Sequence, residues 1–135
     1  MGIEENKAAI QRLVDDVFNG GDLSLIPELV SPNLVVHVIP EYRGHDGLRQ
    51  HILETSKSFS DVQIVINHMF AEEEMVAWSA TLTGIHSGEL AGIAPTGKKI
   101  SATAISLSRM EDGKEAERWQ GQVMGEPSVY QQILD

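Results

Sequence analysis

Two ionisable side chains lie within strand-like segments, where a group that faces an apolar interior needs either a partner or a function. His37 interrupts the apolar run 34–39, and its imidazole titrates near neutral pH, so it could donate or accept a proton. Glu117 lies in the last strand-like segment, and a carboxylate in an apolar pocket has the raised pKa that suits a general acid. Both residues are therefore candidate catalytic groups. The structural alternatives are a buried His37 bonded to the backbone and a Glu117 paired with Arg109.

Aromatic side chains and further histidines supply candidate ligand-binding groups. Trp78 and Trp119 offer the largest flat surfaces for stacking on a planar ligand, although ordinary core packing would also explain them. Tyr42 follows the first predicted strand and could gate the mouth of a pocket. His68 and His86 lie within or at the end of predicted strands, where they could line a pocket rim or be structural or exposed.

Alternation along the last predicted strand groups its side chains into two sets. Glu117, Trp119 and Val123 share one face, and Arg118 and Gln120 share the other. If Trp119 faces a pocket, Glu117 and Val123 face it too. This arrangement predicts that the first set forms the ligand-binding wall.

Several other chemistries have no support in the sequence. There is no cysteine, which excludes disulfides, thiolate metal sites and a cysteine nucleophile. Neither a Gly-x-Ser-x-Gly turn nor a P-loop is present. His45 and His51 are not spaced to form a metal-binding pair on one helix face. We expect no metal and no cofactor.

The elements that must position these residues are helices followed by strands. An amphipathic pattern with apolar residues three and four apart predicts a first helix, and alternation predicts the later strands. Helices are predicted at 4–19, 24–30 and 45–57, and strands at 33–39, 62–70, 75–86, 99–110 and 114–124. Helices followed by a long antiparallel meander indicate an α+β fold. No linker or repeat divides the chain, so we expect one domain over residues 1–135.

The composition narrows the choice of partners. The 135 residues carry a formal net charge of -10, which disfavours nucleic acids and anionic membrane surfaces. Apolar runs are too short to cross a bilayer, and the first residues lack the pattern of a secretory signal. We therefore expect a cytoplasmic protein that has a hydrophobic small molecule as its partner and binds neither nucleic acid nor membrane.

Four stretches of the sequence are together similar to one protein family. VFNGGDLSLIPELVSPNLVVH (17–37), YRGHDGLRQHI (42–52), TGIHSGELAGIAPTGKKI (83–100) and DGKEAERWQG (112–121) resemble the SnoaL-like polyketide cyclases, within the nuclear transport factor 2-like superfamily. The resemblance implies an α+β cone or barrel, in which a curved antiparallel sheet and three helices enclose a deep apolar pocket. It also implies a homodimer or higher homo-oligomer built on the outer face of the sheet.

The resemblance also implies a reaction. Cyclases of this family catalyse an intramolecular aldol condensation of a polyketide ester, using an aspartate four residues after the tryptophan of a Glu-x-Trp pattern. Glu117 and Trp119 match that pattern, and Val123 stands at the aspartate position. Two functions follow as hypotheses. One is a proton-transfer enzyme of the cyclase, isomerase or hydrolase type that uses His37 or Glu117, and the other is a non-catalytic binding or dimerisation module.

Overall fold

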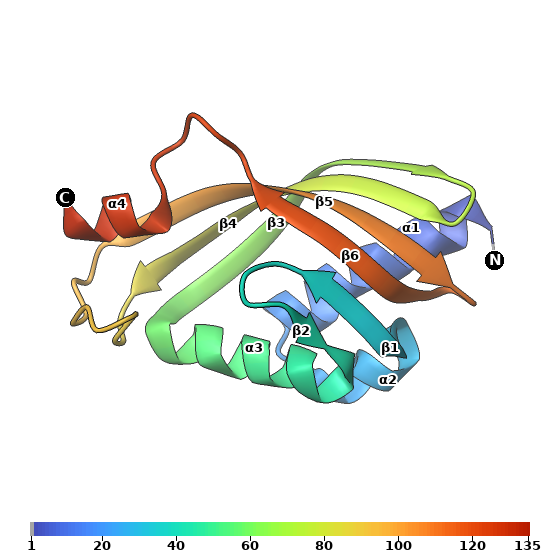
Figure 1. Ribbon diagram of the computed structural model, residues 1–135, viewed down its shortest axis with the longest axis horizontal. Helices are drawn as coiled ribbons and strands as arrows, with labels where there is room; N and C mark the ends of the chain where they lie inside the picture. The colour runs from blue at the N-terminus through green and yellow to red at the C-terminus, as the bar shows by residue number, and fades with distance from the viewer. Residues whose placement is uncertain (1) are drawn as a thin grey trace.

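A curved sheet forms one layer of the molecule, and helices cover its concave face (Figure 1). The computed structural model describes residues 2–135. The helical elements are α1 (Ile3–Arg12), η1 (Leu13–Asn19), η2 (Leu23–Leu25), α2 (Ile26–Leu29), α3 (Gly44–Ser58) and α4 (Val129–Leu134). The strands are β1 (Val30–His37), β2 (Tyr42–Arg43), β3 (Phe59–Glu72), β4 (Met75–His86), β5 (Lys99–Glu111) and β6 (Lys114–Gln122). This architecture confirms the predicted α+β fold.

The sheet is mixed, with the strand order β2-β1-β6-β5-β4-β3. Strands β3 to β6 form the predicted antiparallel meander, because each is joined to the next by a direct reversal of the chain. Strand β1 instead pairs with β6 in parallel, which differs from the expected all-antiparallel sheet. No hairpin joins β1 to β6, so their relative direction is not constrained to be antiparallel.

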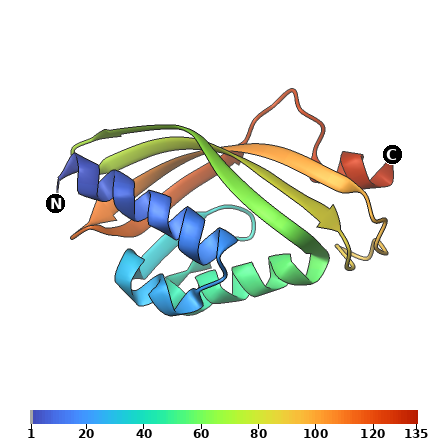
Figure 2. The same ribbon diagram turned by 180° about the vertical axis from the view of Figure 1, so that it is seen from behind.

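The N-terminal helical segment lies along the concave face of the sheet (Figure 2). It continues from α1 into the π-helical turns of η1, and the apolar residues Ile10, Leu13, Val14 and Val17 are fully buried. Asn19 fixes its end, because the Asn19 amide donates to the carbonyl of Ile64 at 2.8 Å and accepts from the Ile64 N–H at 2.7 Å. These contacts hold η1 over the sheet.

Irregularities in the strand pairing, among them one β-bulge near His68 in β3 and one in β6, change which side chains face inwards. In β3 the register shifts between Ile66 and His68, so the residues after the bulge exchange faces. In β6, Ala116 is an extra residue: Glu117 pairs with Arg109 and Glu115 pairs with Met110, so Ala116 between them has no partner on β5. Glu115 and Arg118 are three positions apart, so regular alternation would place them on opposite faces. Because of the bulge, both face the helices.

The two faces of the sheet differ in what covers them. The inner face packs against α1, η1 and α3, and two buried apolar clusters fill this layer. The outer face leaves large apolar side chains in solvent, namely Val65, Phe70, Ile105, Leu107 and Trp119. At the C-terminus α4 packs back on β5, where the Gln132 amide bonds to both backbone groups of Ser101. Among residues 2–135, no helix is both long enough and apolar enough to cross a bilayer.

Candidate functional site

An apolar pocket lies between α3, η1 and the inner face of the sheet. Its volume is about 170 Å³. The lining residues are Phe18, Tyr42, His51, Ile52, Thr55, Ser56, Val62, Ile64, Trp78, Ala80, Leu82, Ala104, Ser106, Arg118 and Gln120. Arg118 is the only one of these lining residues, within the described part of the chain (2–135), that carries a permanent charge. The pocket is therefore an apolar space with a few polar groups in its wall, as small-molecule sites commonly are.

Arg118 lines the pocket and is one partner of a buried ion pair. Its guanidinium donates to both oxygens of Glu115, from Nη2 at 2.7 Å and from Nε at 3.0 Å. Arg118 is 3% exposed and Glu115 is fully buried, so the two charges compensate each other away from water. Ser108 completes the arrangement, because its hydroxyl donates to Glu115 at 2.6 Å and accepts from the Trp78 indole N–H at 2.9 Å.

Tyr42 and His51 form a second polar group in the pocket wall. Their rings stack with centroids 4.5 Å apart and planes inclined by 14°. Burial lowers the pKa of His51, and the positive charge of Arg118 lowers it further. Burial raises the pKa of Tyr42, while Arg118 offsets part of that effect. At neutral pH the pocket therefore presents a neutral imidazole and a neutral phenol beside a cation.

The structure places two of the predicted site residues in this pocket. Trp78 lines it from β4, and Tyr42 lines it from β2. Trp78 also donates a hydrogen bond to Ser108 and packs in a core cluster. The side chain therefore belongs to the core, as the structural alternative expected, and lines the pocket as well.

The predicted orientation of β6 is wrong. The two sets of side chains are grouped as expected, but Arg118 and Gln120 face the pocket, whereas Glu117 and Trp119 face outwards. His37 also lies on the outer face, where its ring stacks on Trp119 with centroids 5.3 Å apart. The physical reason is that Arg118 is buried with its own counter-ion, so the more polar face of the strand can turn inwards.

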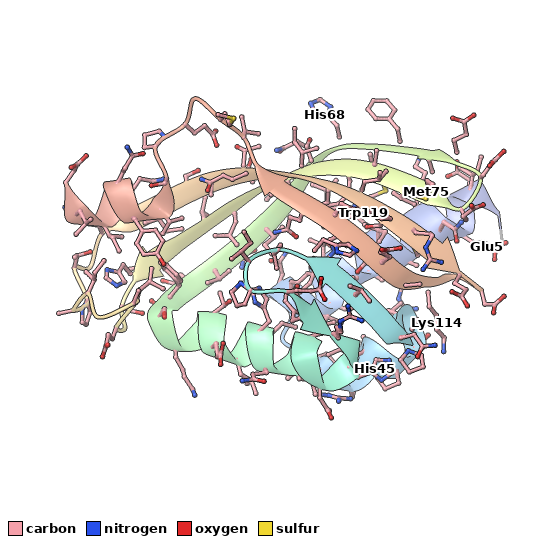
Figure 3. The ribbon with its side chains drawn as sticks, in the orientation of Figure 1. Glu5, His45, His68, Met75, Lys114 and Trp119 are labelled. Atoms are coloured by element: carbon pink, nitrogen blue, oxygen red, sulfur yellow. The ribbon has the colours of Figure 1, made fainter. Side chains whose placement is uncertain are left out.

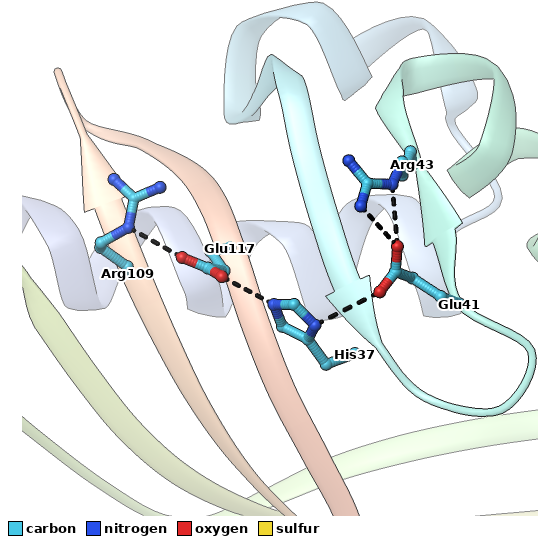
Figure 4. A network of polar contacts seen from close by, with 5 residues as sticks. All are labelled: His37, Glu41, Arg43, Arg109 and Glu117. Carbon is cyan, nitrogen blue, oxygen red and sulfur yellow. Dashed lines mark hydrogen bonds and ion pairs between the residues drawn. The ribbon is translucent and has the colours of Figure 1, made fainter.

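His37 and Glu117 are joined in a polar network on the outer face (Figure 4). His37 Nε2 lies 2.6 Å from Glu117 Oε2, and its Nδ1 lies 3.4 Å from Glu41. Arg109 Nε donates to Glu117 Oε1 at 3.2 Å, which confirms the ion pair considered as the structural alternative. The His37 hydrogen bond lowers the pKa of Glu117, burial opposes this shift, and Arg109 lowers the pKa further. Glu117 is thus held as a carboxylate rather than as a protonated acid.

Three further predicted residues lie outside the pocket. His68 is exposed on the side of the sheet away from α3, because the bulge in β3 reverses its face (Figure 3). His86 is buried at the end of β4, where its Nδ1 accepts from the Thr96 N–H at 3.2 Å. Val123 follows the end of β6, and its N–H donates to the carbonyl of Thr103. None of the three lines this pocket, and the exposed His68 and the buried His86 match the structural alternatives considered for them.

Sequence reasoning missed His51, Arg118 and Glu115 as parts of the site. His51 had a detectable signal, since it lies three positions after the buried Leu48 and beside Ile52 on one helix stripe. The pairing of Glu115 with Arg118 had no signal, because regular alternation groups Glu115 with Glu117 and Trp119 and places Arg118 on the opposite face. No group of three or more His, Asp or Glu side chains within residues 2–135 is arranged to hold a metal ion.

Known proteins share both the sequence pattern and the fold. The family model described as SnoaL-like polyketide cyclase matches residues 8–132. The aklanonic acid methyl ester cyclase AcmA of Streptomyces galilaeus is 28% identical over 117 residues, covering 83% of this chain and 80% of AcmA. Among solved structures, AclR of Streptomyces galilaeus has a TM-score of 0.79 at 32% identity and covers 92% of this chain and 78% of its own. IdmH of Streptomyces antibioticus has a TM-score of 0.76 at 25% identity, with coverages of 96% and 95%.

Proposed function

Since the chain belongs to the SnoaL-like polyketide cyclase family, we propose that its pocket binds a polyketide-like carbonyl compound and catalyses proton transfer at a carbon next to a carbonyl group. The observation that carries this proposal is the meeting of His51, Tyr42 and Arg118 in one apolar pocket. Trp78 and Phe18 supply aromatic surface for a cyclic ligand. The match to the SnoaL-like polyketide cyclase family model and the similarity to AcmA, an aklanonic acid methyl ester cyclase, support this choice of substrate class.

His51 is the proposed general base. Its lowered pKa keeps the imidazole neutral at pH 7, so that it can accept a proton. Neither ring nitrogen of His51 is engaged by a hydrogen-bond partner within residues 2–135. Arg118 is the proposed electrostatic stabiliser, because some of its N–H groups are unused by Glu115 and Gln120.

The proposed step is balanced without any co-reactant. His51 removes a proton from the carbon next to a carbonyl, and the electron pair of the C–H bond forms an enolate. The enolate oxygen accepts hydrogen bonds from N–H groups of Arg118. The enolate carbon then attacks a second carbonyl of the same molecule and forms a C–C bond. The oxygen of that second carbonyl takes the proton back from His51. The overall reaction is an isomerisation that closes a ring.

Deuterium exchange tests the proton transfer separately from ring closure. The probe is 2-tetralone, a bicyclic ketone with acidic C–H groups, incubated with the protein in D₂O and followed by mass spectrometry. We expect exchange above the buffer rate with the native chain and loss of that excess in His51→Ala. Binding of 2-tetralone without excess exchange would contradict the catalytic proposal and favour the non-catalytic binding module.

The outer face of the sheet is the proposed homodimer interface. Its five large apolar side chains expose a patch that a monomer would leave in water, with Phe70 71% and Ile105 59% exposed. A two-fold axis through this face would bring the same patch of both copies together. The His37–Glu117–Arg109 network lies beside Leu107 and Trp119 on this face, so it would border the interface.

A further inference from the structure

The buried carboxylate of Glu115 determines the charge that a ligand meets in the pocket. Arg118 is the only permanent charge in the lining described within residues 2–135, and Glu115 lies directly behind it. Glu115 accepts three hydrogen bonds, two from Arg118 and one from Ser108. The Ser108 hydroxyl is itself held by the Trp78 indole, so the carboxylate has little freedom to turn away. The pair is therefore a fixed, electrically balanced unit.

The donors that remain on Arg118 can still bind an oxygen atom. Three of its N–H groups are used by Glu115 and Gln120, and the guanidinium also interacts with the Tyr42 phenol, but a guanidinium has more N–H groups than these contacts use. The pocket also contains the phenol of Tyr42 and the imidazole of His51, both neutral at pH 7. The site thus offers hydrogen-bond donors without a net positive charge.

We propose that Glu115 makes this pocket selective for an uncharged carbonyl group over a carboxylate. An uncharged carbonyl accepts a hydrogen bond from an Arg118 N–H group that Glu115 and Gln120 do not use, at a small desolvation cost. A carboxylate loses far more hydration on entering, and it meets a guanidinium whose charge is already compensated by a second carboxylate nearby. This inference rests on the proposed function, since it concerns the ligand of the same pocket, and it assigns Glu115 as a specificity-determining residue.

The first experiment compares two ligands of nearly equal shape with the native chain. 2-Acetonaphthone carries a neutral ketone, and 2-naphthoate carries a carboxylate on the same ring system. Isothermal titration calorimetry at pH 7 should give at least roughly tenfold tighter binding of the ketone. Equal affinities, or tighter binding of 2-naphthoate, would overturn the inference while leaving the proposed pocket intact. Binding of neither compound would overturn both proposals.

The second experiment removes the charge of Glu115. In Glu115→Gln the guanidinium loses its counter-ion, so the ratio of the two affinities should shift towards 2-naphthoate by roughly tenfold or more. The matched control is Glu111→Gln, which removes a carboxylate paired with Arg109 at 3.3 Å at the exposed end of β5. The control should keep the native ratio. An unchanged ratio in folded Glu115→Gln, checked by circular dichroism, would contradict the inference, and the native comparison decides the case if this variant does not fold.

Discussion

The ring of Tyr42 lies flat against the ring of His51, with centroids 4.5 Å apart, although one residue belongs to β2 and the other to α3. The contact fixes the imidazole in the pocket wall, where burial and Arg118 keep it neutral. A neutral imidazole held in a fixed orientation beside a cation is suited to removing a proton from carbon.

Replacement of His51 by alanine should lower the rate of proton transfer by roughly 10²–10⁴-fold, the usual contribution of a general base. In the native chain the rate should fall as the pH decreases, because protonated imidazole cannot act as a base. The midpoint should lie below about 6.5, the ordinary value for histidine, since the pKa of His51 is lowered. The pH profile of deuterium exchange measures both effects. His68→Gln is the control, and a similar loss in that variant would contradict the assignment.

Replacement of Arg118 by methionine should destabilise the protein by about 3–5 kcal/mol, because Glu115 would be left buried without its counter-ion. Urea unfolding measures this change. The double variant Glu115→Leu/Arg118→Met should recover most of the loss. In Arg109→Met the broken ion pairs are partly exposed, so the loss should stay within about 1 kcal/mol. Equal losses in the two single arginine variants would contradict the importance of the buried pair.

Replacement of Glu117 by glutamine should reduce the acid sensitivity of the fold. The pKa of Glu117 is lowered in the folded state, mainly by the hydrogen bond from His37. Its stabilising contribution is therefore complete above the unfolded value of about 4.3, and it disappears as the pH falls through the lower folded value. Thermal unfolding between pH 7 and pH 3 should show a smaller drop for Glu117→Gln than for the native chain. The exposed Glu72→Gln should behave as the native chain does, and parallel curves for all three would contradict the prediction.

Replacement of Ile105 by lysine should convert a dimer to a monomer. The new charge would lie in the centre of the apolar outer face and would lose hydration in any interface built there. Sedimentation velocity at several protein concentrations gives the mass of each variant. Leu53→Lys, which changes an exposed apolar residue of α3, should remain dimeric. A native chain that stays monomeric at all concentrations would contradict the proposed interface.

The periodicity of the sequence predicted the elements well, but it could not decide which face of β6 turns inwards. Alternation shows only which side chains share a face. Hydrophobicity favoured an inward Trp119, whereas the structure buries Arg118 with Glu115 and leaves Trp119 40% exposed. That ion pair depends on the extra residue Ala116, and a bulge in β3 likewise moved His68 to the outer face. Bulges arise from strand pairing over a long distance, which local patterns do not record.

The bulge at Ala116 places Glu115 on the pocket side of β6 and Glu117 on the outer side, although both residues belong to one strand. Without this irregularity, a chain carrying the same glutamate and arginine would turn the carboxylate to the outside and leave a bare cation in the hollow. Relatives that share both residue types can therefore differ in whether they prefer an uncharged or a negatively charged compound. Spacing within the strand has to be compared along with residue identity before ligand preference is transferred from one member of the family to another.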